Sequence, residues 1–204
     1  MDKGFDTYDP PRVAELSDQI RTDGYSFVGL YFFRSSGYKK HLTPDVARCI
    51  CRAGLFIVSL WEDGDPTSAE YFSSARGCTD AKSYLAQASG WVPSGSVVYP
   101  TYDFDPSPSD IAGPCSDYAT AFHSVIKVDG AYDCGAYGSG ALLTHLMGIG
   151  VINRTMLSQS RDYSGHSDWV DRADIVQGPA TVYHGLDIDP DVSVTGNGGG
   201  WKLV

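Results

Sequence analysis

Positive charge is scarce in this sequence of 204 residues. Lys and Arg number 15 against 25 Asp and Glu, which gives a formal net charge of −10 at pH 7. Nucleic-acid binding requires clustered basic side chains that displace counterions from the phosphates, and here the basic residues are scattered as well as few. The sequence therefore predicts no nucleic-acid partner.

Long apolar runs are also absent. The longest, Leu55 to Trp61, has seven residues, whereas a helix that crosses a bilayer needs about 20. The stretch from Met1 to Asp6 lacks the apolar segment of a secretory signal. We therefore expect no membrane span and no signal peptide in the chain as written.

Cysteine is sparse and odd in number. The cysteines are Cys49, Cys51, Cys78, Cys115 and Cys134. A chain of this length buries roughly 70% of its unfolded surface and needs no disulfides or metal to fold, so we expect mostly reduced, buried thiols. The five histidines have no HxH or HExxH spacing, and Asp187-x-Asp189-x-Asp191 lacks the glycine and glutamate of a calcium loop. We predict no metal and no cofactor.

The residues that are present form an ordinary globular mixture, 42% apolar and 12% aromatic, which excludes disorder and a coiled coil. Short β-branched or aromatic runs alternate with helical stretches. The expected strands are Gly4–Thr7, Phe27–Phe33, Leu55–Trp61, Ser96–Phe104, Asp133–Tyr137, Met156–Gln159, Ile175–Gln177 and Leu186–Ile188. The expected helices are Pro11–Thr22, one that opens at Thr43 and closes at Gly54, Asp80–Ser89, Ser116–Ile126 and Ser139–Met147.

This alternation favours a parallel α/β protein. Leu55–Trp61 is apolar almost throughout, which is typical of a strand buried on both faces. Eight strands leave about 25 residues for each strand–helix unit, so a single TIM-like (β/α)8 barrel over residues 1–204 fits if some helices are short or missing.

Polar side chains stand at the predicted strand ends, where barrel active sites lie. They are Asp6, Tyr31, Arg34, Trp61, Glu62, Asp63, Asp103, Asp105, Tyr137, Gln159, Gln177, Asp187 and Asp189. Any single aspartate there serves equally well as a helix or turn cap. Several carboxylates that converge on one barrel mouth repel one another, however, and that cost points to a function.

The strongest local signal is the pair Asp103 and Asp105. On a strand, residues two apart point to the same side, about 6.6 Å from each other. Repulsion would keep one carboxyl protonated as a general acid, and glycoside hydrolysis requires such an acid beside a second carboxylate. Asp187 and Asp189 repeat the spacing. Aromatic residues offer flat faces to sugar rings, although such residues on strands are more often core: Tyr31, Trp61, Tyr99 and Tyr137.

Pieces along the whole chain carry a family resemblance by their order and spacing. They are Gly4–Tyr8, Gly24–Gly29, Leu42–Pro44, Ala53–Leu55, Gly77–Ala81, Val98–Asp105, Gly135–Gly140 and Asp187–Asp189. Together they resemble the glycoside-hydrolase-like family known as the domain of unknown function 1906, a relative of the family 25 lysozymes.

The resemblance implies a TIM-like barrel that acts on peptidoglycan or a related polysaccharide. Asp6 matches the first-strand acid of family 25 lysozymes, Asp103 the first acid of their Asp-x-Glu motif, and Asp187 is similar to their late-strand Asp. Asp105 stands where those lysozymes carry Glu. Its side chain is one methylene shorter, which weakens the transfer of lysozyme activity but not the resemblance.

We therefore expect a glycan hydrolase with Asp105 as general acid/base, Asp103 as the stabilising or orienting carboxylate, and Asp6 and Asp187 tuning that pair. The expected substrate-binding residues are Tyr31, Trp61, Glu62, Tyr99, Tyr137, Gln159, Gln177 and Asp189. Two alternatives stay open: a glycan-binding barrel with weak or no turnover, and a cation-assisted hydrolase that uses the same acidic mouth. Because a net charge of −10 slows the approach to an anionic envelope, we also expect delivery or processing, with a separate wall-targeting or delivery partner.

Overall fold

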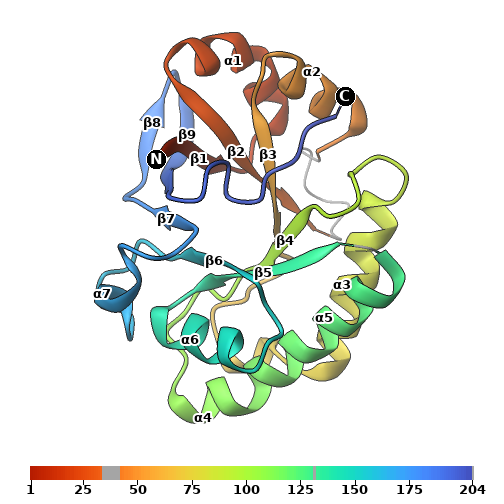
Figure 1. Ribbon diagram of the computed structural model, residues 1–204, viewed down its shortest axis with the longest axis vertical. Coiled ribbons are helices and arrows are strands. Elements are labelled where there is room, and N and C mark those ends of the chain that lie inside the picture. The colour runs from red at the N-terminus through yellow and green to blue at the C-terminus, as the bar shows by residue number, and fades with distance from the viewer. Residues whose placement is uncertain (34–41, 131, 204) are drawn as a thin grey trace.

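A computed structural model describes residues 1–33, 42–130 and 132–203 of the chain (Figure 1). Arg34 and His41 lie outside the described residues. Within them, eight strands close into a barrel in the order β1 to β7 and then β9, which returns to β1. The predicted TIM-like barrel is confirmed.

The strands are short and the helices unequal in length. The strands are β1 (Asp2–Thr7), β2 (Tyr25–Phe32), β3 (Phe56–Trp61), β4 (Val97–Pro100), β5 (Asp133–Gly138), β6 (Arg154–Leu157), β7 (Ile175–Gln177), β8 (Thr181–Tyr183) and β9 (Leu186–Ser193). The helices are α1 (Pro10–Thr22), α2 (Pro44–Arg52), α3 (Ser74–Ala88), α4 (Pro108–Asp110), α5 (Ser116–Gly130), α6 (Gly140–Gly148) and α7 (His166–Trp169), with a 3₁₀ turn at Ala69–Tyr71 and a π turn at Ile111–Cys115. Helices are short on the side of the barrel that β6 and β7 form, as α7 illustrates (Figure 1).

The last barrel strand departs from the prediction of a parallel sheet. β9 runs antiparallel to both β7 and β1. A parallel return needs a crossover of a dozen or more residues, whereas the short link from Gln177 to Leu186 holds only β8, which pairs with β9 as a hairpin outside the barrel. The start of β9, with Asp187 and Asp189, consequently lies at the face where the parallel strands end.

Two predicted boundaries were wrong in ways that affect the site. α3 begins at Ser74 rather than Asp80, because the side chain of Ser73 accepts a hydrogen bond from the amide of Arg76 and caps the helix earlier. β4 ends at Pro100, so Asp103 and Asp105 lie on a loop and not on a strand.

Side chains fill the inside of the barrel, and a second layer of apolar residues packs between the strands and the helices. The interior rings are accommodated by glycines on neighbouring strands: a Cβ on Gly4 would lie 2.3 Å from the ring of Phe27, and one on Gly135 would lie 2.4 Å from that of Tyr99. The interior is thus a packed core and not a pore.

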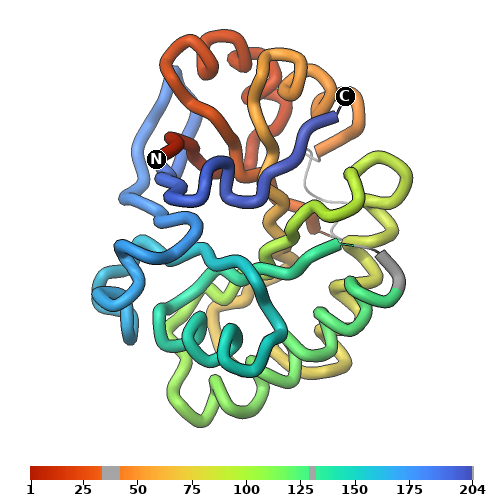
Figure 2. The backbone as a smooth tube through the Cα atoms, viewed as in Figure 1, coloured from red at the N-terminus to blue at the C-terminus, as the bar shows by residue number. Residues whose placement is uncertain are grey.

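The C-terminal segment covers the end of the barrel where the parallel strands begin, and Figure 2 shows this dark blue segment crossing β1 and β3. Trp201 pairs with Ile57 on β3, and the hydroxyl of Tyr99 donates to the carbonyl oxygen of Gly198 at 2.6 Å. The opposite end, where the parallel strands finish, carries the candidate site.

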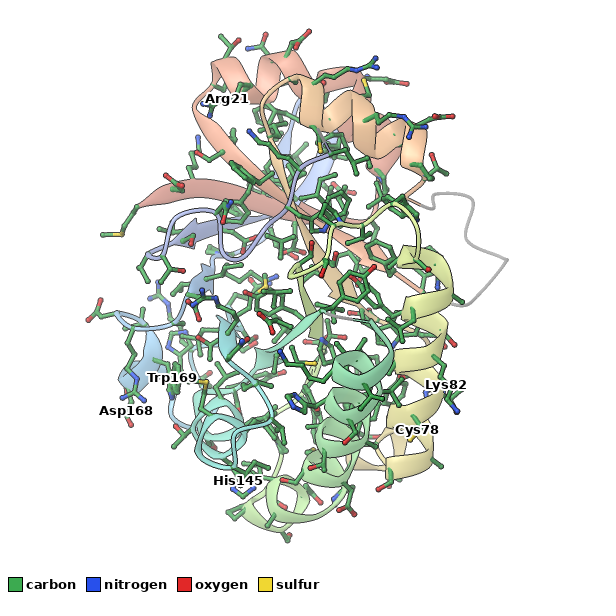
Figure 3. All side chains as sticks on the ribbon, turned by 45° about the vertical axis from the view of Figure 1, so that its right-hand side comes forward. Arg21, Cys78, Lys82, His145, Asp168 and Trp169 are labelled. Atoms are coloured by element: carbon green, nitrogen blue, oxygen red, sulfur yellow. The ribbon has the colours of Figure 1, made fainter. Side chains whose placement is uncertain are left out.

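Lys82 on α3 and His145 on α6 are directed away from the barrel (Figure 3). All five cysteines have free thiols, and Cys51, Cys115 and Cys134 are buried. No helix in the described parts of the chain has the length and apolar character to cross a membrane.

Candidate active site

Asp6 forms the floor of the site at the end of β1. The residue is 1% exposed, and its two carboxyl oxygens accept hydrogen bonds from the hydroxyl of Tyr31 and the side-chain amide of Gln177, both at 2.7 Å. Burial raises the pKa of Asp6 to about 7, the two hydrogen bonds oppose that rise, and the charges of Asp189 and Glu62 add to it. Asp6 therefore titrates close to neutral pH.

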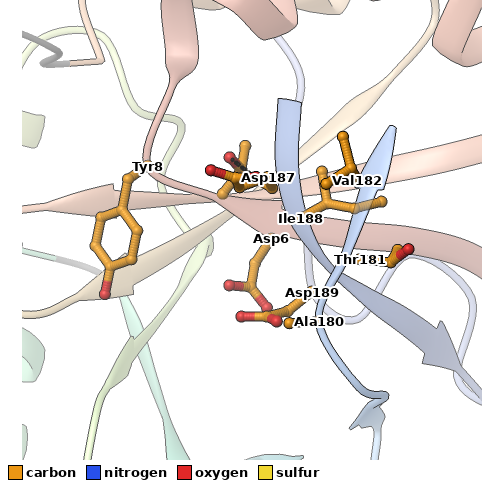
Figure 4. A pocket seen from close by; sticks show the side chains of 9 residues that line it. Asp6, Tyr8, Ala180, Thr181, Val182, Asp187, Ile188 and Asp189 are labelled. Carbon is orange, nitrogen blue, oxygen red and sulfur yellow. Dashed lines mark hydrogen bonds between the residues drawn. The ribbon is translucent and has the colours of Figure 1, made fainter. Parts of the chain in front are cut away.

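The acidic residues of β9 lie at three depths. Asp189 stands opposite Asp6 in the sheet, and Asp191 stands opposite Gly4, deeper in the barrel. Figure 4 shows the carboxyl groups of Asp6 and Asp189 together, with Asp187 apart from them. Asp187 is exposed, and its backbone oxygen accepts the hydroxyl of Thr7 at 2.7 Å.

The pKa values of these β9 aspartates respond to burial. Burial raises the pKa of Asp189, and the charge of Asp103 adds to the rise. Asp191 is 1% exposed, and its pKa is raised well above the usual range by burial and then by the charges of Asp6 and Asp189.

Glu62 follows β3 and is tied to Tyr8, which follows β1. The hydroxyl of Tyr8 donates to Glu62 Oε1 at 2.7 Å. Burial raises the pKa of Glu62, and the charges of Asp103 and Asp65 act in the same direction, while the bond from Tyr8 lowers it.

Tyr8 also borders two hollows at this face. A pocket of about 360 Å³ lies between Tyr8 and the β8–β9 hairpin and includes Asp6, Asp187 and Asp189. A smaller one of about 30 Å³ lies between Tyr8 and Glu62. The Tyr8 ring, 51% exposed, therefore stands between the carboxyl groups of β9 and that of Glu62.

The predicted acidic pair separates on its loop. The amide of Asp103 donates to the carbonyl oxygen of Pro66 at 3.1 Å, and Asp103 is exposed with a pKa raised by partial burial and by the charge of Asp65. Both oxygens of Asp105 accept the amide of Ser164 at 3.0 Å, and one also accepts its hydroxyl at 2.8 Å. Asp103 thus belongs with the loop after β3, and Asp105 with the loop after β6.

Two of the predicted sugar platforms are part of the core instead. Trp61 is 1% exposed and packs edge-on against Tyr84 of α3, and Tyr99 is fully buried with its hydroxyl on the C-terminal segment. Neither ring can reach a ligand, because alternating strand positions direct it into the packed interior or toward the helices.

The other predicted binding residues act on the carboxyl groups. The hydroxyl of Tyr137 lies 2.9 Å from Gln177 Oε1, which orients the amide that serves Asp6. Gln159 forms a side-chain hydrogen bond with Asp189. The structure thus places Tyr31, Tyr137 and both glutamines beside the carboxyl groups of the site.

Sequence reasoning missed two residues of the site. Tyr8 directly follows the first strand. The segment Gly4–Tyr8 was recognised as part of the family resemblance, but no role was predicted for Tyr8. Asp191 continues the alternation of Asp187 and Asp189, a pattern that was tested only as a calcium loop. In the described parts of the chain, no group of His, Cys, Asp or Glu side chains is arranged to hold a metal ion.

Comparison with known proteins places these features in a family. The family model described as the Rv2525c-like, glycoside hydrolase-like domain matches residues 18–192. The chain belongs to this family. No curated protein sequence matches the chain.

Solved structures with the same fold span nearly the whole chain of this family member. The Tat-secreted protein Rv2525c of Mycobacterium tuberculosis is similar with a TM-score of 0.77 at 19% identity, over 98% of each chain. A lysozyme from Streptomyces coelicolor gives 0.64 at 14% identity over 95% of this chain and 92% of the lysozyme. A family 25 glycosyl hydrolase from Bacillus anthracis gives 0.57 at 10% identity over 95% and 89%. At these identities the similarity shows the fold alone.

Proposed function

We propose that the protein is a glycan hydrolase of the lysozyme type, which cleaves peptidoglycan or a related polysaccharide by paired-carboxylate acid/base chemistry. The observation that carries the proposal is the meeting of four carboxyl groups at the open face of the barrel, where the charge of each acts on another: Asp6, Glu62, Asp103 and Asp189. Burial and like charge raise the pKa of such groups, which is the direction of shift that general acids require. Glycoside hydrolysis takes one protonated acid and one carboxylate.

The geometry favours a division of roles between Asp6 and Asp103. Asp6 suits the carboxylate that stabilises a developing oxocarbenium ion, because two donors stabilise its charged form. Asp103 suits the general acid, because it is exposed to an incoming sugar and because partial burial and the charge of Asp65 raise its pKa. Asp105 is the acid predicted from the sequence, and its two oxygens are occupied by Ser164.

The larger pocket has the character of a site for one sugar unit. Its acidic floor is formed by Asp6 and Asp189, and Tyr8 offers an exposed aromatic ring at one side. Val182 on β8 supplies an apolar wall that is 65% exposed. An aromatic or apolar wall beside polar groups fits the alternating polar and apolar faces of a sugar ring.

A glycan-binding barrel with weak or no turnover is the second candidate. It is favoured by one observation: Asp105 is shorter than the Glu of family 25 lysozymes and is tied to Ser164. A fold supports many functions, and its chemistry resides in particular side chains.

We further propose that the protein acts at the cell envelope or outside the cell. The similar M. tuberculosis protein is Tat-secreted. A net charge of −10 slows the approach to an anionic wall, which favours a separate wall-targeting or delivery partner.

The test is incubation of the parent protein and Asp6→Asn with peptidoglycan sacculi. We expect the parent to release reducing ends, the variant to release about 10²–10⁴-fold fewer, and both to sediment with the sacculi. Binding by both without cleavage by the parent would establish the binding module. A parent protein that neither cleaves nor binds the sacculi would refute both candidates. Activity that EDTA abolishes and a divalent cation restores would instead establish cation-assisted hydrolysis.

A further inference from the structure

Asp191 is a buried acid that the proposed reaction does not use. It stands opposite Gly4 on β1 and Gln177 on β7, below the level of Asp6, and the residue is 1% exposed. Neither of its carboxyl oxygens has a hydrogen-bond partner among the described residues. An ionised carboxylate without donors is costly in such surroundings, so the state that suits this position is the protonated one.

The groups that face Asp191 are acidic. On its own strand the charge of Asp189 acts on Asp191, and on β1 the charge of Asp6 does so. Asp6 is two positions from Gly4, the residue opposite Asp191, so Asp6 and Asp191 are diagonal neighbours on one face of an antiparallel pair. Their titrations are therefore linked, and a second negative charge at this depth would be repelled by the first.

The two diagonal neighbours differ in what they accept. Asp6 receives one hydrogen bond from Tyr31 and one from Gln177, and the latter residue stands directly opposite Asp191 in the sheet. Donors stabilise a charged carboxyl group, and a carboxyl group without donors keeps its proton. When the pair loses its first proton, that proton leaves Asp6 and the second remains on Asp191.

We propose that Asp191 is a positioning residue that holds one proton beneath Asp6 and so limits the buried pair to a single negative charge, carried by Asp6. The role given to Asp6 rests on the proposed function, whereas the proton on Asp191 does not. With Asp191 neutral, Asp6 can ionise and stabilise positive charge on a sugar. With Asp191 charged, Asp6 would be held in its protonated form.

Infrared spectroscopy tests for the proton directly. A protonated carboxyl group has a C=O stretching band that is distinct from carboxylate bands and that shifts in D₂O. We expect the parent at pH 8 to show such a band, Asp191→Asn to lack it, and Asp6→Asn to retain it. Asp187→Asn, on the same strand but exposed, is the matched control and keeps the band. A parent without the band, or a band that survives in Asp191→Asn, overturns the proposal.

Carbon NMR of the aspartate carboxyl groups tests the positioning role. In the parent, the Asp6 signal should move once as Asp6 ionises and again at higher pH as Asp191 loses its proton. In Asp191→Asn the second movement should vanish, a change that loss of mere packing does not produce. If the second movement persists in that variant, Asp191 does not act on Asp6.

The outcomes separate this proposal from the proposed function. If Asp191→Asn fails to fold, Asp191→Leu replaces it as an uncharged variant of similar volume, and the spectrum of the parent still decides whether the proton is present. A parent that cleaves no glycan but shows the band refutes hydrolysis and leaves the proton on Asp191 standing. A parent that cleaves glycan but lacks the band supports hydrolysis and refutes the proton on Asp191.

Discussion

The rings of Tyr8 and Tyr31 stack with their centroids 4.0 Å apart and their planes 14° from parallel, and their hydroxyl groups serve different carboxyl groups. Tyr31 donates to Asp6 and Tyr8 donates to Glu62, each at 2.7 Å. One ring is buried and the other is 51% exposed. The stack therefore joins the floor of the site to its rim and fixes the orientation of both acids.

Replacing Tyr8 with Phe keeps the stacked ring and removes the donor to Glu62. Because that hydrogen bond lowers the pKa of Glu62, its loss should raise the pKa further, and the free energy of unfolding should fall by about 0.5–1.5 kcal/mol. NMR titration of the Glu62 carboxyl carbon measures the shift.

The matched control for Tyr8→Phe is Tyr183→Phe. Tyr183 also donates its hydroxyl to an aspartate, Asp23, at 2.6 Å, but outside the site. It should leave the Glu62 titration unchanged. Equal shifts of Glu62 in both variants would refute a specific bond from Tyr8.

Asp6→Asn should change how stability depends on pH. The folded pKa of Asp6 is raised to about 7, so its contribution to stability is full below the unfolded pKa of about 3.9 and is lost as pH rises through 7. Relative to the parent, Asp6→Asn should therefore become more stable between pH 4 and pH 8, by up to about 4 kcal/mol.

Denaturant unfolding of both proteins at pH 4, 6 and 8 measures this difference. Asp187→Asn is the control, because Asp187 lines the same pocket but is exposed. Its unfolding curve should follow that of the parent at each pH. Parallel pH dependences for Asp6→Asn and the parent would show that Asp6 titrates normally.

Much of the barrel could be predicted from the sequence because its signals are local. Pro44 at the first turn of α2, the Thr43 cap and the apolar run of β3 each specify their element. The direction of β9 was missed although the sequence holds the signal, because the eight residues between Gln177 and Leu186 are too few for a parallel crossover. The end of β4 was missed because the alternating pattern of Ser96–Phe104 continues beyond Pro100, where the strand ends. The amide of Asp103 bonds instead to another loop.

The site was predictable in outline and not in detail. Asp6 was predicted because it ends the first strand, together with other strand-end carboxylates, and matches the first-strand acid of family 25 lysozymes. The separate surroundings of Asp103 and Asp105 were not predicted, because Ser164 lies far along the chain from Asp105 and only the fold brings the two residues together. The rings of Trp61 and Tyr99 were misplaced because an aromatic residue on a strand gives no sign of how deep it will lie.

A partly buried ion pair holds the loop that carries Glu62. Arg76 on α3 bonds Asp80 at 2.9 Å and reaches the backbone oxygen of Asp63 at 2.6 Å, and Asp80 is fully buried. Arg76→Met should lower the free energy of unfolding by about 3 kcal/mol, because it leaves the charge of Asp80 without its cation. It should also alter the Glu62 titration, because the adjacent residue Asp63 loses an anchor.

Arg12→Met is the matched control for Arg76→Met. It removes an exposed pair with Glu15, and such pairs contribute about 0–1 kcal/mol. Urea unfolding gives the energies, and NMR gives the titration. An unaltered Glu62 titration in Arg76→Met would show that the ion pair stabilises α3 without positioning the site.

The identity of the general acid is decided by comparing Asp103→Asn with Asp105→Asn. If Asp103 is the acid, Asp103→Asn should lower turnover of sacculi by about 10²–10⁴-fold with little effect on stability, since its carboxyl group is exposed. Asp105→Asn replaces one of the two acceptor oxygens for Ser164 with an NH₂ donor, so it should loosen the loop after β6 and reduce turnover far less.

Ser164→Ala separates a role in the loop from a role in the chemistry. It removes the hydroxyl bond to Asp105 and keeps the amide bonds, so a loop effect should appear in both Ser164→Ala and Asp105→Asn, in proportion to the bonds lost. A proton donor would behave otherwise: Asp105→Asn would lose activity at least as severely as Asp103→Asn, and Ser164→Ala would retain it. That result would return the acid to Asp105, where the resemblance to family 25 lysozymes places it, and would leave Asp103 as the carboxylate that orients the substrate.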